Sequence, residues 1–499
     1  MIGSRASRSI DRPRRHGARL APVLAVALIC AACSTSAATQ SRSASPSGLW
    51  PSASWPGATW PGATPTEASP LPATETPATT DTPSVIHGEF DVAMGSVPLA
   101  VATDDYGAVA ATQINDFGLV LLRHLEAGGN LCISPTSVAL SLAMVRPGAR
   151  GQTATEMDSI LPALGTDADA PEVVALLKSF ESDTQYVDGN GIPLTSDSSP
   201  DPANPDPATE LDISNQAFVQ QGLVLEPAYL DALSSHFNAG LGLLDFKNDP
   251  EAARLAINKW AKERTNGRIP NVLHEGDVTS ATRIALANAI YLKAAWAWQF
   301  DPKLTKPGAF KTAAGTTVSV PTMAIDRTFG YSAGTGYRAV ELPYSGDMSM
   351  VIAVPDDMAS FLGGLTAAKL NHLVTPGPQT YDVDLTLPRF SIDSRFDLAG
   401  ALSSMGMPTV FGQSADLSGI TAQEPLRLSS VIHEANIDVV ESGTTASAVT
   451  VSLGVTTGGG DPEPPVHVQL HINKPFLYFI RDSSSGAVLF MGRVDDPSK

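Results

Sequence analysis

The chain has 499 residues, 43% of them hydrophobic, so it can bury a large core and is not wholly disordered. It holds 32 basic and 51 acidic residues, a net charge of −19. Six arginines and one aspartate precede residue 33, which leaves 26 basic and 50 acidic residues, or −24, in the remainder. Such a surface repels phosphate, so we expect no nucleic-acid partner. Only one of the three cysteines, Cys132, follows residue 33, so neither a disulfide scaffold nor a structural zinc site is expected.

The first 32 residues have the pattern of a secretory signal peptide. An arginine-rich start precedes an apolar run, Leu20–Ala32, which is too short to span a bilayer as a mature helix. The run ends in Cys30-Ala31-Ala32-Cys33, which resembles the bacterial lipobox. That resemblance implies cleavage before Cys33, lipidation of its thiol and anchoring at the bacterial cell surface. The alternative is ordinary cleavage, which gives a soluble secreted protein.

Residues 33–104 are rich in Pro, Ser, Thr and Ala and lack a hydrophobic period. They include a short tandem in which Trp-Pro-Gly-Ala-Thr occurs at Trp55 and again at Trp60. Segments of this composition cannot bury enough apolar surface to fold. We therefore expect a disordered stalk that holds the folded domain away from the surface.

The first half of the folded part is predicted to be helical. Helical spacing of apolar residues predicts helices over 114–126, 171–180 and about 253–261, the last ended by Gly267. Ser134-Pro135 is a strong helix start, because Ser caps free amides and Pro loses no hydrogen bond in the first turn. Residues 183–212 are rich in Asp, Pro, Ser and Gly and are predicted to form a surface insertion.

Strand-like runs dominate the second half. They cover residues 284–292, 348–354, 382–387, 476–480 and 487–491. Helices first and strands later favour an α+β fold over a doubly wound parallel sheet.

The chain lacks the common catalytic motifs, so we expect neither an enzyme nor a cofactor. It has no Gly-x-Ser-x-Gly elbow, no P-loop and no His-Glu-x-x-His. His467 and His471 are four residues apart in a segment that reads as a strand. On a strand they share a face but are too far apart to bind one metal by themselves, so we expect two solvent-facing histidines and no metal site.

The C-terminal part, and then most of the chain, resembles the serpin family. The segment 441–450 is similar to the hinge of a serpin reactive loop, and 473–482 with 489–494 to the family's C-terminal signature. Further similar blocks follow the family order at 130–137, 148–153, 257–269, 288–300, 341–344 and 387–390. The resemblance covers about 105–497. It implies a monomeric serpin fold with three β-sheets, eight or nine helices and an exposed reactive-centre loop, here 441–466.

The resemblance also implies a function, which is suicide-substrate inhibition of extracellular serine proteases. After cleavage the loop enters the central sheet as a new strand, and every second side chain must fit a packed core. The alternate hinge residues that start at Thr444 are all small, and Gly443 can supply the bend before them. The hinge residues that the resemblance assigns are Glu441, Gly443, Thr444, Ala446, Ala448 and Thr450.

The resemblance puts the scissile bond about sixteen residues after Glu441, at Thr457-Gly458. A small or β-branched residue before the cut suits an elastase-like or subtilisin-like serine protease, and a papain-like cysteine protease is a further candidate. Because no Arg or Lys lies nearby, a trypsin-like target is disfavoured.

Two further groups of residues are assigned by the resemblance. Four polar residues match the family's shutter beneath the central sheet: Ser134, Ser137, Asn288 and His433. Trp296 matches the breach, where loop entry begins. Cys132 is expected to pack as a small apolar group.

One alternative from another class stays open. It is a non-inhibitory binding or adhesion module that uses the same fold on a stalk. Members of the family that have lost inhibition tend to carry bulky, charged or proline residues in the hinge, and no proline or charged residue stands at 442–457 here.

Overall fold

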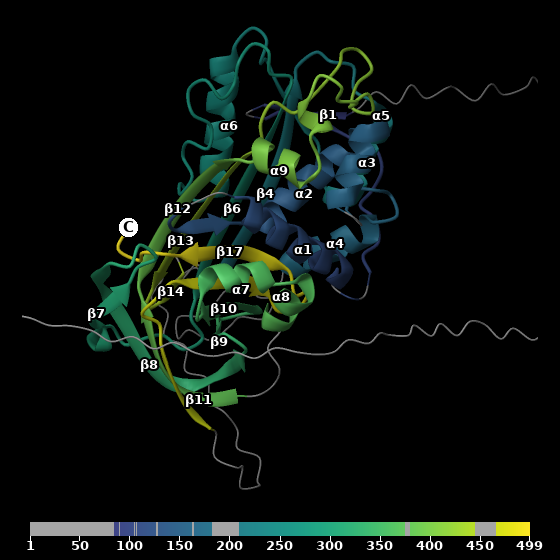
Figure 1. The fold of residues 1–499 in the computed structure, drawn as a ribbon. Coiled ribbons are helices and arrows are strands. Elements are labelled where there is room, and N and C mark those ends of the chain that lie inside the picture. The colour runs from purple at the N-terminus through teal and green to yellow at the C-terminus, as the bar shows by residue number, and fades with distance from the viewer. Residues whose placement is uncertain are drawn as a thin grey trace, which may run out of the picture. The chain divides into compact units, whose positions relative to one another are not determined.

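In the computed structural model the described residues run from 84 to 499, with gaps at 89, 104, 106, 126–127, 162–163, 182–208, 375–379 and 445–465. They form nine α-helices and two extended sheets (Figure 1). The α+β class expected from the sequence is confirmed.

The first sheet has eight strands. In spatial order they are β1 (Ser84–Ile86), β2 (Asp91–Met94), β5 (Leu241–Leu244), β4 (Thr209–Gln220), β6 (Ile284–Ala295), β14 (Gly443–Thr444), β13 (Ile432–Val440) and β12 (Phe390–Asp397). The short strand β14, of two residues, lies between the longer strands β6 and β13.

The second sheet has nine strands. Its path is β15 (His467–His471), β11 (Thr380–Pro388), β8 (Thr317–Gly334), β9 (Tyr337–Pro343), β10 (Met348–Pro355), β16 (Phe476–Asp482), β17 (Val488–Val494) and β3 (Leu131–Ile133), with β7 (Lys306–Lys311) beside β8. The 18-residue β8 joins the second and third sheets that the resemblance implies, because it pairs with β7 and β11 along most of its length and with β9 at its end.

The helices are α1 (Ala108–His124), α2 (Pro135–Val145), α3 (Gly151–Ile160), α4 (Ala170–Glu181), α5 (Pro227–Phe237), α6 (Pro250–Arg264), α7 (Met358–Gly364), α8 (Ala367–Val374) and α9 (Ala399–Met405). Every residue of α2 is buried, because this helix packs against β4 and β6 of one sheet and β17 of the other. Ser134 caps α2 as predicted, since its Oγ accepts a hydrogen bond from the Ser137 amide. The helix α2 is therefore the core element on which the central sheet rests.

The structure corrects several boundaries. Strands β1 and β2 lie within the predicted stalk, and β2 pairs with β5, so the stalk does not extend to residue 104. Strand β4 begins at Thr209, inside the predicted 183–212 insertion. Helices α3 and α5 were not predicted, and α1 begins six residues before the predicted start. In each case a short or weakly periodic segment is held by tertiary contacts that local patterns do not contain.

Several predicted features lie outside the described residues. They are the signal peptide 1–32 with Cys33, the stalk up to 83, and residues 183–208 of the insertion. Within the described residues, no helix is both long and apolar enough to cross a membrane.

Candidate functional site

The candidate site is the opening between β6 and β13 in the first sheet (Figure 1). At one end of the opening β14 pairs with both neighbours: Gly443 and Thr444 oppose Ala295 and Ala294 of β6. On the other side the same two residues oppose Val440 and Val439 of β13. The start of the predicted reactive loop is therefore already a strand of the sheet.

At the other end of the opening β6 and β13 pair directly. Ile432 opposes Ala287, and His433 opposes Asn288, in parallel register. Between the two ends, the described residues 289–293 of β6 and 434–438 of β13 have no pairing across the opening. Five residues on each of the two strands are therefore without a ladder partner across the opening.

Glu441 anchors the chain just before it enters the sheet. Its buried carboxylate accepts hydrogen bonds from Arg389 Nε, at 2.9 Å, and from the hydroxyl of Thr305. Burial by itself raises the pKa of Glu441, but these donors outweigh it and hold the pKa below its ordinary value. The carboxylate is therefore charged at neutral pH and fixes the start of the hinge.

Gly443 is required by its geometry. Its φ is 149°, and a Cβ built there would overlap the carbonyl oxygen of Ala294 on β6. Only glycine fits this approach of the two backbones without strain.

Thr444, the first residue of the small alternate set, points inward. Its side chain is buried, and its Oγ1 lies 2.6 Å from the hydroxyl of Tyr344. The Tyr344 ring stacks on Trp296, with centroids 4.4 Å apart and planes within 6°. The Trp296 indole in turn donates to the Val440 carbonyl at 2.9 Å, and its amide donates to the Ser442 carbonyl at 3.0 Å. Trp296, the residue assigned to the breach, is therefore hydrogen-bonded to the chain directly before β14 begins.

The four predicted shutter residues are brought together under the closed end of the opening. The Ser134 amide donates to His433 Nε2 at 3.0 Å, and Asn288 Nδ2 lies 3.4 Å from the Ser137 carbonyl. All four side chains are fully buried. They come from α2, its cap, β6 and β13, so they connect the two strands at the closed end to the helix that packs against them.

Two further members of this polar cluster were missed by the sequence analysis. Asn215 of β4 accepts from the hydroxyls of Ser137, at 3.1 Å, and Ser141, at 2.9 Å. Asn288 also donates to Ser141. Ser141 follows Ser137 by four residues, on the same face of a mostly apolar helix, which is the signal that would have identified it.

The cluster leaves one donor and one acceptor unsatisfied at the closed end. Because the Ser134 amide can only donate, His433 Nε2 is the acceptor and Nδ1 carries the proton. Neither His433 Nδ1 nor Asn288 Oδ1 has a partner among the described residues, although both are buried. Burial lowers the pKa of His433 to about 4, so the ring is neutral at pH 7.

The remaining predicted site residues belong to the loop and to the core. Ala446, Ala448, Thr450, Thr457 and Gly458 lie outside the described residues. Cys132 is fully buried, and burial raises the pKa of its thiol to about 12, in keeping with an unreactive apolar side chain.

Known proteins are similar to this chain over most of its length, from about residue 112 to residue 497. The family model described as "Serpin (serine protease inhibitor)" matches residues 112–497. A leukocyte elastase inhibitor from Bos taurus is 34% identical over 393 residues, which cover 77% of this chain and 97% of the relative. Serpin B3 from Homo sapiens is 32% identical, over 74% of this chain and 94% of the relative.

The fold also matches solved structures. The native state of tengpin, a thermophilic serpin, has a TM-score of 0.66 at 23% sequence identity. The match covers 81% of this chain and 97% of that chain.

Proposed function

The chain belongs to the serpin family, and from that membership we propose that it is a suicide-substrate inhibitor of extracellular serine proteases. The family is one of serine protease inhibitors rather than enzymes. The observation that carries the proposal for this chain is the position of β14, which occupies one end of a strand-wide opening in the central sheet. After cleavage, the rest of the loop would extend that strand along the unpaired residues of β6 and β13.

The register of β14 can be continued along the loop. If the register continues residue by residue, Ala446 would lie opposite Leu292 of β6 and Ile437 of β13. Ala448 would lie opposite Ile290 and Ala435. These strand residues are buried, so the inward positions of the incoming strand need small side chains. Thr444, Ala446 and Ala448 meet that need.

In the same register Thr450 would arrive between Asn288 and His433. Those are the residues whose Oδ1 and Nδ1 have no partner in the present state. A threonine hydroxyl both donates and accepts, so it can satisfy the two groups at once. Insertion would therefore separate β6 from β13 and complete the polar cluster in one step.

The proposed chemistry is an interrupted proteolysis. The hydroxyl oxygen of the protease's catalytic serine attacks the carbonyl carbon of Thr457, and the bond to the Gly458 nitrogen breaks as that nitrogen takes a proton and leaves as an amine. The protease is then held by an ester bond to Thr457. If the cut loop enters the sheet before water attacks the ester, the protease is carried away with its active site distorted.

The test is incubation of the purified chain with an elastase and with subtilisin, followed by denaturing electrophoresis. We expect a covalent complex that survives SDS. Replacing inward Thr444 with Arg would bury a charge and turn the chain into an ordinary substrate. The matched variant Thr445→Arg, on the outward face, should still form the complex.

Mass spectrometry of the released C-terminal fragment tests the scissile bond, and a new N-terminus at Gly458 is expected. Papain, as a cysteine protease, and trypsin serve as comparison enzymes, with trypsin expected to form no complex. Clean loop cleavage without any complex would instead favour the non-inhibitory binding or adhesion module.

We also propose that the chain acts as a monomer outside the cell, anchored to a bacterial surface through lipidated Cys33. The support for the lipid anchor is the sequence 30–33, which stands at the end of the apolar run Leu20–Ala32. Detergent partition of the expressed chain, compared with a Cys33→Ser variant, tests this. A soluble secreted product from both would contradict it.

A further inference from the structure

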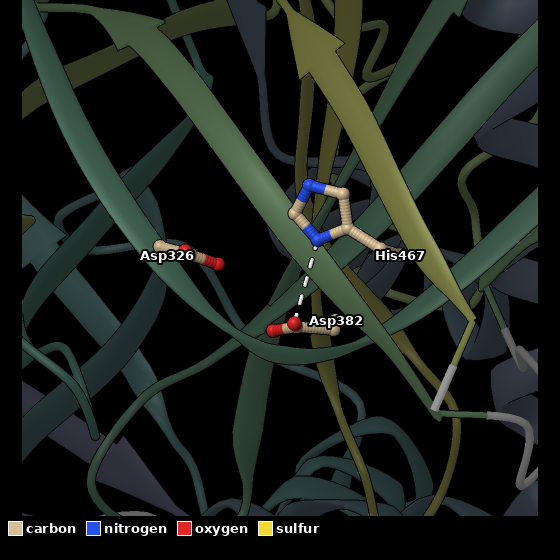
Figure 2. A group of neighbouring side chains, drawn as sticks. All are labelled: Asp326, Asp382 and His467. Carbon is tan, nitrogen blue, oxygen red and sulfur yellow. Dashed lines mark hydrogen bonds and ion pairs between the residues drawn. The ribbon is translucent and has the colours of Figure 1, made fainter. Parts of the chain in front are cut away.

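Three side chains outside the candidate inhibitory site, two of them exposed and one half-buried, lie close together on one face of the second sheet (Figure 2). Asp326 comes from β8, Asp382 from β11 and His467 from β15, three adjacent strands. One ligand atom from each lies within 4.8 Å of the other two. His467 Nδ1 and Asp382 Oδ2 are 3.4 Å apart, close to the roughly 3.3 Å between neighbouring ligands in a tetrahedral zinc site.

Three carboxylates lie on this face of the second sheet. Asp326 stands directly opposite Asp384, and Asp384 is two residues from Asp382 on the same face of β11. Like charges opposite one another on adjacent strands destabilise a sheet. Asp382 and Asp384 have histidines near them, His467 at 3.4 Å and His471 at 3.7 Å, whereas the Asp326 carboxylate has no hydrogen-bond or ion-pair partner among the described residues.

We propose that Asp326, Asp382 and His467 form a binding site for a divalent transition-metal ion of the zinc class. The set offers two carboxylate oxygens and one imidazole nitrogen, with open positions for water. An imidazole donor suits zinc and its neighbours, whereas calcium and magnesium prefer sites made of oxygen alone. No metal site was expected from the sequence, because His467 and His471 alone are too far apart to share an ion. The strands β8 and β11 supply the further ligands, Asp326 and Asp382.

The position of the site gives it a mechanical effect. Strand β15 is the five-residue edge of its sheet and begins two residues after the end of the undescribed segment 445–465. An ion shared by β8, β11 and β15 would cross-link this edge strand to the two strands beside it. A bound ion therefore holds the C-terminal attachment of the loop in place, whether or not the loop inhibits a protease.

The experiment is titration of the full-length chain, without an affinity tag, with Zn²⁺ by calorimetry at neutral pH. Asp326→Asn is the sharpest variant, because it removes a ligand but breaks no contact within the described structure. We expect Asp326→Asn and His467→Gln to weaken Zn²⁺ binding about tenfold or more, with Ca²⁺ binding far more weakly than Zn²⁺. His87→Gln is the matched control, since His87 also pairs with an exposed aspartate, Asp91, at 2.7 Å but has no third ligand among the residues that the structure describes.

Hydrogen exchange gives the second readout. Zn²⁺ should slow amide exchange in residues 467–471 of the unaltered chain and of His87→Gln, and should not do so in Asp326→Asn. The proposal is overturned if Zn²⁺ does not bind, if Asp326→Asn and His467→Gln bind it as tightly as the unaltered chain, or if the His87 variant loses binding equally.

Discussion

At the residue scale, the hinge depends on side chains that are small for different reasons. Gly443 has no Cβ because its backbone lies against Ala294, whereas Thr444 is small because its side chain is enclosed beside Tyr344. Glu441 is instead kept as a charged anchor by Arg389. Sequence alternation identified Thr444 as an inward position, but the contact with Tyr344 could not be read from it, since 100 residues separate the two.

Gly443→Ala should expel β14 from the sheet. The new Cβ overlaps the Ala294 carbonyl, and the φ of 149° is unfavourable for alanine, so we expect a loss of about 1–3 kcal/mol in unfolding free energy. Urea denaturation measures this. Gly315→Ala is the control: its φ of 82° is also unfavourable, but no atom lies near the new Cβ. Equal losses in both variants would show that contact with Ala294 is unimportant.

His433 should make stability depend on pH. The neutral ring is buried with a pKa of about 4, while in the unfolded chain its pKa is about 6.5. The unfolded state therefore binds more protons between these values, so stability is full above about pH 6.5 and falls toward pH 4, by up to about 3 kcal/mol. Comparing urea midpoints of the unaltered chain and His433→Gln across this range checks it, and a variant with the same slope would contradict the assignment.

At the element scale, the two strands before α1, β1 and β2, lie in a segment that was predicted to be a disordered stalk. β2 pairs with β5, the Phe90 ring meets the Phe218 ring edge-on at 5.0 Å, and the Gly95 amide donates to Ser234 Oγ at 2.9 Å. These contacts begin before residue 112, where the family match starts. The composition of residues 33–104 gave no sign of them, because two strands of three and four residues have too few positions to show a period.

Removing residues 1–104 should destabilise the domain, whereas removing residues 1–83 should not. The longer deletion exposes the edge of β5 and the Phe218 ring, at a cost on the order of 3 kcal/mol from lost burial and hydrogen bonds. Thermal melting of the two truncated chains measures the difference. If both truncated chains have the same melting temperature as the full-length chain, β1 and β2 contribute nothing to stability.

At the scale of the whole molecule, the first sheet holds an opening that its own chain can fill. If a cut loop inserts fully, about a dozen new ladder hydrogen bonds, at about 1 kcal/mol net each, would supply a driving force on the order of 10 kcal/mol. We expect the two buried groups without partners among the described residues, His433 Nδ1 and Asn288 Oδ1, to favour the entry of a strand that can bond them.

Cleavage in the loop should therefore make the protein more stable. We expect the melting temperature to rise on the order of 15 °C after limited proteolysis between residues 445 and 465. Differential scanning calorimetry of intact and cleaved protein is the measurement. Cleaved Thr444→Arg is the control, since its strand cannot enter and its melting temperature should not rise. An unchanged melting temperature in the cleaved unaltered chain would contradict strand insertion.

The sequence by itself was enough for the α+β class, five of the strands and the serpin resemblance, because periodicity, capping and spaced motifs are local properties. It also singled out Ser134, Ser137, Asn288 and His433 through that resemblance. The tertiary structure alone brought Asn215 and Ser141 to them, placed β1 and β2 at the edge of the first sheet, and gathered Asp326, Asp382 and His467 on one face. The physical reason is the same throughout: register between strands far apart in the chain is set by packing of the whole core, and no single segment carries it.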